Sequence, residues 1–377
     1  MLSSVGASHQ CFLSDGCRDA IVVELLFYIF PLHPTPYTLH PPPNRMEVNE
    51  LRDAYAAGER NFAKVNLISA DLSKINLTRA NLEGAFFTGA NLNRTRLIGA
   101  NLNGAFLYRA NLSFAKLEKS TLIEADLTKT NCTGAILLKS NLQAAKLSGA
   151  LLKGVNLAAA NLKGVNLCGA DLRGINLRGA NLTEANLSWA NLSEARLSGA
   201  VLQGALLNGV KFSHAYLNGV DFSQLELDGV DFSEAKLSGA NFTQANLTAS
   251  NFIGAYLRGA ILQEANLQSA DLTEAILTRA CLRHANLTKA NLTDADLHAA
   301  DLTGTKLNLA SLFGTNLSEA ELCNAYLWRA SLDEVSLYRA NLQGASLRDA
   351  DLNNVDMRDA VLLDALMPDG EFCELAG

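Results

Sequence analysis

The sequence has few features that point to a membrane protein or to a disulfide-stabilised protein. The apolar run of residues 20–32 is interrupted by Glu24 and is too short to span a bilayer as a helix. The seven cysteines are an odd number with no close pair in the repeated part of the chain, which disfavours a secreted disulfide framework. We therefore expect no membrane span and a cytoplasmic location.

Groupings typical of catalysis or metal binding are also scarce. The histidines of the repeated part, His214, His284 and His298, lie far apart in outward positions. Cys281 and His284 have a C-x-x-H spacing, but the residues around them do not complete a zinc site. There is no glycine-rich loop of the kind that cradles phosphate, and no carboxylate pair stands out. We predict no catalytic residue, no metal, no cofactor and no small-molecule substrate.

What the sequence does contain is a five-residue rhythm that runs unbroken over residues 60–367. Its central position recurs 62 times and holds 52 Leu, seven Phe, two Met and Cys132. Two residues earlier stands a small residue, which is Ala in 43 copies. The unit reads A-(N/D)-L-x-x, as in Ala70-Asp71-Leu72-Ser73-Lys74.

A five-residue repeat fits neither regular secondary structure. On an α-helix each step would turn the central residue by about 140° net, and on a straight strand it would change face at every step. A short extended piece followed by a turn does satisfy the pattern, because the small and central residues then both point inward. We therefore predict a coiled tube with Ala and Leu inside, and Leu72 and Leu82 among its core residues.

The A-(N/D)-L-x-x array resembles the pentapeptide-repeat family, in the style of its cyanobacterial members. The resemblance implies an all-β fold, a right-handed quadrilateral β-helix with four repeats in each coil. On that basis the 62 repeats form about 15 coils, and the tube is roughly 70 Å long at the ~4.8 Å spacing of β-strands.

Phenylalanines in the middle of the array agree with four sides. Phe212, Phe232 and Phe252 recur at every fourth repeat and would stack on one side of the core, while Phe222 and Phe242 would stack on the opposite side. A coil of only two repeats would also align these phenylalanines, so the pattern alone does not fix the number of sides. Two residues misfit the small position: Arg60, where the array begins, and Leu225, which indicates a local bulge or repacking.

The segments outside the array carry separate expectations. Residues 1–45 include a proline-rich stretch, and we expect them to be disordered, with translation beginning at Met46; a signal or anchor formed by residues 20–32 is the alternative. Residues 46–59 are predicted to form an amphipathic capping helix with Val48, Leu51 and Tyr55 on one stripe. Residues 368–377 are predicted to form a turn, from Pro-Asp-Gly, and a tail.

Outward aromatic residues are the unusual feature of the surface. Phe86 and Phe106 occupy the polar position of repeats that lie four apart, and they should stack on one outer side, with Tyr108 beside them. An exposed aromatic cluster can mark a partner-binding site, although isolated exposed aromatics need no explanation. With four sides, the same side also carries Trp189, Tyr326 and Trp328.

Charge divides the array into two halves. Residues 61–200 hold 16 Lys/Arg and eight Asp/Glu, whereas residues 201–377 hold 11 Lys/Arg and 23 Asp/Glu. Three interpretations fit this difference in charge: random variation among solvent-exposed positions, electrostatic steering of a partner, and head-to-tail or dimeric self-association. We predict a non-catalytic scaffold for an unidentified protein partner. The alternative is a DNA-mimic modulator of a topoisomerase such as gyrase, acting through the acidic half. No interleaving of aromatic and basic residues supports nucleic-acid binding.

Overall fold

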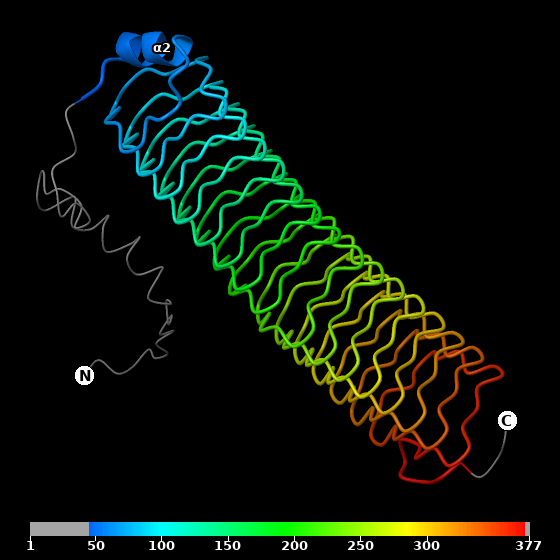
Figure 1. The fold of residues 1–377 in the computed structure, drawn as a ribbon. Coiled ribbons are helices and arrows are strands. Elements are labelled where there is room, and N and C mark those ends of the chain that lie inside the picture. The colour runs from blue at the N-terminus through cyan, green and yellow to red at the C-terminus, as the bar shows by residue number, and fades with distance from the viewer. Residues whose placement is uncertain (1–44, 374–377) are drawn as a thin grey trace, which may run out of the picture. The chain divides into compact units, whose positions relative to one another are not determined.

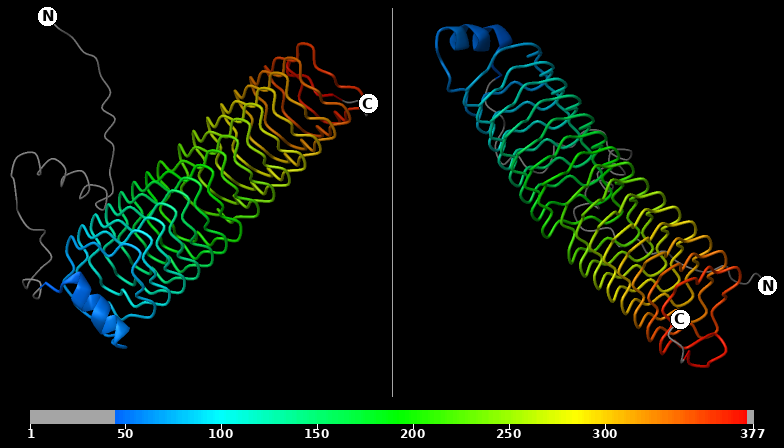
Figure 2. Two further views of the ribbon diagram at one scale, coloured as in Figure 1. Left: turned by 90° about the horizontal axis from the view of Figure 1, so that it is seen from above. Right: turned by 90° about the vertical axis from the view of Figure 1, so that its right-hand side faces the viewer.

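The structure is a computed structural model and describes residues 45–373, so the expectations for residues 1–44 and 374–377 lie outside the described residues. Residues 60–367 form a right-handed, four-sided β-helix with stacked coils (Figure 1). The only helix of the described residues, α2 (Val48–Ala56), lies across the first coil (Figures 1 and 2). The β-structure of the described residues consists of bridges of one residue each rather than longer strands, and all but one of these bridges are parallel.

Each coil contains four repeats. The polar residue of a repeat is bridged in parallel to the polar residue of the fourth repeat after it, as Asn61 is to Asn81. The predicted four-sided coil is therefore confirmed, and this step of four repeats defines four sidewalls. We name them side A, which begins at Asn61, side B, at Asn66, side C, at Asp71, and side D, at Asn76.

The last two residues of each repeat form the corner between two sides. The amide of the next small residue closes the turn, as the Ala145 N–H does by donating to the Leu142 carbonyl at 3.0 Å. The second corner residue adopts the left-handed conformation, with φ of 54° at Ala144 and 65° at Gly154. Glycine accepts this conformation without strain, whereas most other residues resist it.

The preference for Asn or Asp follows from two hydrogen bonds. The Asn181 Oδ1 accepts from the backbone N–H of Thr183 at 3.1 Å, which holds the start of the corner. The Asn101 Nδ2 donates to the Asn81 Oδ1 in the preceding coil at 3.1 Å, so amides form ladders along a side. One side chain can thus stabilise both the turn and the stack.

The core contains the central and small residues, and Leu72 and Leu82 are fully buried. The five central phenylalanines form two stacked columns, with ring centroids 5.4 Å apart for Phe212–Phe232, 5.0 Å for Phe232–Phe252 and 4.9 Å for Phe222–Phe242. Rings of opposite columns meet edge to face, as Phe222 and Phe232 do at 5.7 Å.

Helix α2 covers the first coil. Leu51 is fully buried, and the Tyr55 hydroxyl donates to the Thr78 carbonyl at 3.0 Å. The Arg60 guanidinium lies 3.8 Å from the centroid of the Tyr55 ring, which explains a charged residue at a small position. The helix is shorter than the predicted 46–59, and Gly58, with φ of 101°, leads the chain out of it.

The C-terminal end of the array reverses on itself. Phe372 forms an antiparallel bridge with Leu366, and the Met367 N–H donates to the Glu371 carbonyl at 2.8 Å. Residues 368–373 therefore return onto the last coil after the predicted turn. The last ladder row at this end is thereby partly paired, which reduces its exposure as an open edge.

The stack is interrupted near Leu225. At every other junction between two coils of the described array, backbone hydrogen bonds join the coils on each side where both are present. Between residues 198–209 and 218–228 the described structure contains no such bond. The missing bridges are Val201–Asp221 on side A and Leu206–Glu226 on side B. The expected departure at Leu225 is thus an opening in the ladder rather than an extra residue.

Candidate interaction face

Side B and the corner that follows it carry the predicted aromatic cluster. The Phe86 and Phe106 rings stack in parallel, with centroids 5.0 Å apart and planes 9° apart. Tyr108 lies at the adjoining corner, where the Arg109 guanidinium is 5.3 Å from the centroid of its ring. All three aromatic residues are half-buried. They form one small amphipathic patch, with a cation at its edge.

The same side carries further apolar residues along its length. Trp189 and Leu206 lie in the middle, each 48% exposed, and Tyr326 near the far end is 51% exposed. The Trp189 indole lies over Gly209 of the next coil, where a larger residue would collide with it. Trp328 lies at the corner that follows Tyr326 on side B, and its Nε1 donates to the Asp349 carboxylate at 3.0 Å. Side B therefore presents aromatic groups at three levels, separated by polar ladder residues.

Side D carries a second series that the sequence analysis missed. Arg196, Tyr216, Lys236 and Tyr256 lie one above another in successive coils. The Lys236 Nζ is 3.2 Å from the centroid of the Tyr256 ring, a cation–π contact. The expectation that aromatic and basic residues do not interleave is therefore wrong on side D, where they alternate in successive coils. A search at the period of one whole coil would have found them.

Carboxylates flank this series and reduce its positive charge. The His214 Nδ1 lies 3.2 Å from Glu234 at the corner between sides C and D, in the column that also contains Glu194. A shallow depression between Glu194, His214 and Arg196 is open to solvent. The mixed charge does not favour a polyanion such as nucleic acid, whose binding needs several uncompensated cations.

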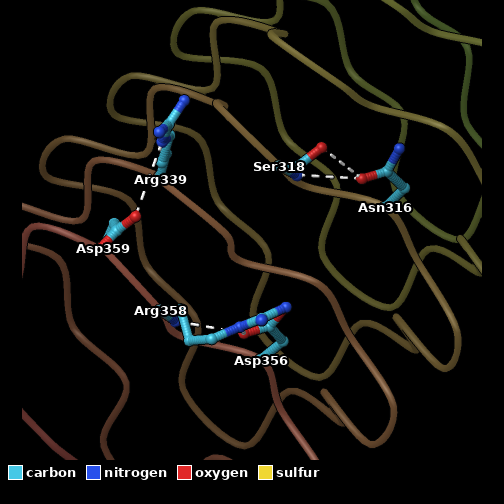
Figure 3. A network of polar contacts seen from close by, with 6 residues as sticks. All are labelled: Asn316, Ser318, Arg339, Asp356, Arg358 and Asp359. Atoms are coloured by element: carbon cyan, nitrogen blue, oxygen red, sulfur yellow. Dashed lines mark hydrogen bonds and ion pairs between the residues drawn. The ribbon is translucent and has the colours of Figure 1, made fainter.

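The acidic half of the array is partly neutralised by ion pairs on its own surface. Figure 3 shows Arg358 bonded to Asp356 at 2.8 Å and Arg339 near Asp359 at 3.7 Å. The side-chain hydrogen bond from Arg358, with help from its backbone N–H, lowers the pKa of Asp356 to about 2. The Asn316 Oδ1 in the same view accepts from Ser318, as the repeat requires.

Few other chemical groupings are found in the described part of the chain. Within residues 45–373, no group of three His, Cys, Asp or Glu side chains could hold a metal ion. Cys132 occupies a central position in the core, where burial raises the pKa of its thiol to about 11. His298 and His284 lie apart from each other on different repeats, and His298 contacts Ser318.

No helix in the described part of the chain has the length and apolar character needed to cross a membrane.

The five-residue repeat matches a known protein family. A family model described as pentapeptide repeats matches a series of segments, most of them overlapping, from residues 61–97 to 324–359. Among solved structures, HetL of Nostoc sp. strain PCC 7120, described as involved in heterocyst differentiation regulation, is 28% identical over 87% of this chain and all of its own, with a TM-score of 0.17. Rfr23 of Cyanothece 51142 is 28% identical over 43% of this chain and 92% of its own, with a TM-score of 0.17.

QnrB1, described as a plasmid-mediated fluoroquinolone resistance protein, is 18% identical over 56% of this chain and 91% of its own, with a TM-score of 0.29. The comparison with curated proteins gave no match. The family model covers most of the array and corresponds to the five-residue unit that builds its four sides. The chain belongs to the pentapeptide-repeat family.

Proposed function

We propose that the protein is a non-catalytic scaffold that binds a protein partner along side B. The observation that carries this proposal is the Phe86–Phe106 stack with Tyr108 beside it, on a side that repeats aromatic groups further along. Aromatic residues with a nearby arginine are enriched at protein interfaces and supply much of the binding energy there. The coil spacing holds these groups at fixed separations, so little conformational entropy is lost on binding.

A paired-variant capture experiment tests the proposal. The protein is expressed in its own cells with a proximity-labelling tag, as wild type and as Phe86→Ser/Phe106→Ser. The control is Phe114→Ser/Phe313→Ser, which removes two exposed aromatic residues from the corner after side C. We expect specific labelled proteins to be lost from the side B variant and kept by the control. If the two variants label the same proteins as the wild type, the proposal fails.

A second candidate is a topoisomerase modulator that presents the acidic half of the array in place of DNA. The observation in its favour is the excess of Asp and Glu over Lys and Arg in residues 201–377. The ion pairs at Asp356 and Asp359 weaken it, because paired carboxylates project less negative charge. A supercoiling assay with purified gyrase distinguishes the candidates: lack of effect at micromolar protein excludes this role.

A further inference from the structure

The opening between residues 198–209 and 218–228 is an isolated fault in an otherwise continuous ladder. Seven backbone N–H groups have no backbone acceptor in the described structure, although their equivalents in other coils donate to the neighbouring coil. The opening is bounded by intact bonds, Leu197 to Tyr216 at 2.9 Å and Phe212 to Asp231 at 2.7 Å. The seven donors are those of Gly199, Leu202, Gly204, Leu207, Gly209, Asp221 and Glu226.

Leu225 lies near the centre of this opening and accounts for it. It is the only leucine at a small position of the array, and its counterpart in the preceding coil is Ala205. The same coil also has Val220 and Val230 at small positions and Phe222 and Phe232 at central ones, whereas the coil before it has only Val210 and Phe212, so its core side chains occupy more volume. β-Branched small residues alone do not open the ladder, since it is continuous at Val155. Excess volume in a close-packed core displaces the backbone.

The two remaining sides hold the coils together across the fault. On side C the Phe212 N–H donates to the Asp231 carbonyl at 2.7 Å, and on side D the Leu217 N–H donates to the Lys236 carbonyl at 2.8 Å. The opening is narrow, because Leu202 is only 1% exposed and Ala205 only 7%. It is too narrow for a strand of another chain to enter without further separation, which excludes simple strand addition as its role.

We propose that this fault is a hinge, at which two blocks of coils pivot along sides C and D and open on sides A and B. Backbone bonds across a coil junction resist bending, and here half of the perimeter has none. The hinge lies where the array changes from an excess of basic to an excess of acidic residues. Each block thus carries its own charge and its own aromatic groups on side B, and the angle between the blocks sets how these groups are presented.

Hydrogen exchange followed by mass spectrometry gives the first test, on the intact chain. The seven amides named above should exchange about tenfold or more faster than their counterparts two coils earlier, at residues 159, 162, 164, 167, 169, 181 and 186, all of which donate to a neighbouring coil. Leu225→Ala should restore protection to the level of those earlier coils. Val335→Ala, which trims a small position in a continuous part of the ladder, should change nothing near residue 225. Equal protection in the wild type would overturn the proposal.

Pulsed electron-electron distance measurements distinguish a hinge from local fraying. Spin labels on non-native amino acids at residues 163 and 263 span the fault at the corner between sides A and B, and labels at 153 and 253 span it at the corner between sides C and D. A hinge predicts a broader distance distribution for the first pair, which narrows in Leu225→Ala. Equal widths for the two pairs, or no narrowing, would show that the blocks do not pivot.

Discussion

Phe232 is the best-connected ring of the core, and its replacement measures what the phenylalanine columns contribute. Its centroid lies 5.4 Å from that of Phe212 and 5.0 Å from that of Phe252, both stacked, and 5.7 Å from those of Phe222 and Phe242, both edge to face. A buried Phe→Ala change costs about 3–5 kcal/mol. Each aromatic pair adds about 0.5–1.5 kcal/mol beyond its buried area, so four pairs amount to roughly 2–6 kcal/mol.

Leucine at the same position separates the two contributions. Phe232→Leu keeps an apolar residue of the type found at most central positions but removes all four ring pairs. Phe87 is the matched control, because it is fully buried and no ring pair involves it among the described residues. We therefore expect Phe232→Leu to lower the free energy of unfolding by at least about 2 kcal/mol more than Phe87→Leu does.

Urea denaturation followed by circular dichroism measures these differences, with the slope of the transition checked for each variant. Because repeat arrays can unfold in parts, the transition of the central coils is the one to be compared. The same loss of stability in Phe232→Leu and Phe87→Leu would refute the reasoning: the rings would then act only as apolar volume, and their columns would add nothing.

Three further predictions concern the corners, the surface and the core. Ala144→Gly should raise the free energy of unfolding by about 1 kcal/mol, because Ala144 has a left-handed φ of 54°. Gly154→Ala should lower the free energy of unfolding by a similar amount, since the added Cβ meets no neighbour and only the backbone strain changes; thermal unfolding measures both effects. The Asp356 carboxyl should titrate near pH 2 by NMR, and Arg358→Gln should return its pKa toward 3.8. Because the pKa is lower in the folded protein, the ionised carboxylate stabilises the fold at pH values above 3.8, and this contribution is lost as the pH falls toward 2. Cys132, whose pKa is raised to about 11 by burial, should resist iodoacetamide at pH 8 until the protein unfolds, as mass spectrometry of the labelled peptide would show; labelling at the rate of an unfolded control would contradict its burial.

Much of the fold can be predicted from the sequence because one local rule repeats without interruption. The leucine rhythm excludes a helix and a flat strand, and the columns of phenylalanine agree with the four sides that the bridges confirm. The exact course of the ladder cannot be predicted in this way. Leu225 indicates a departure, but whether a wider coil bulges, repacks or separates from its neighbour depends on how both coils share the space around Ala205.

Surface chemistry is less accessible to sequence reading, because neighbours on a side are separated along the chain by a whole coil. The Phe86–Phe106 pair can be predicted from the sequence, because the same aromatic residue recurs at the polar position of repeats that lie four apart. Tyr216 and Lys236 were missed, because residues of different kinds give no visible repeat along the chain. The cation–π contact in their series emerges only when successive coils are laid over one another.

The four-repeat coil has a consequence for how such a gene can change. Loss or gain of a single repeat keeps the core pattern but turns every later residue by one side, so that Tyr326 would move from side B to a neighbouring side. Loss or gain of a whole coil keeps every residue on its side and changes only the distance between levels. Duplication in steps of four repeats therefore lengthens the array while preserving its faces, whereas single repeats reshuffle them.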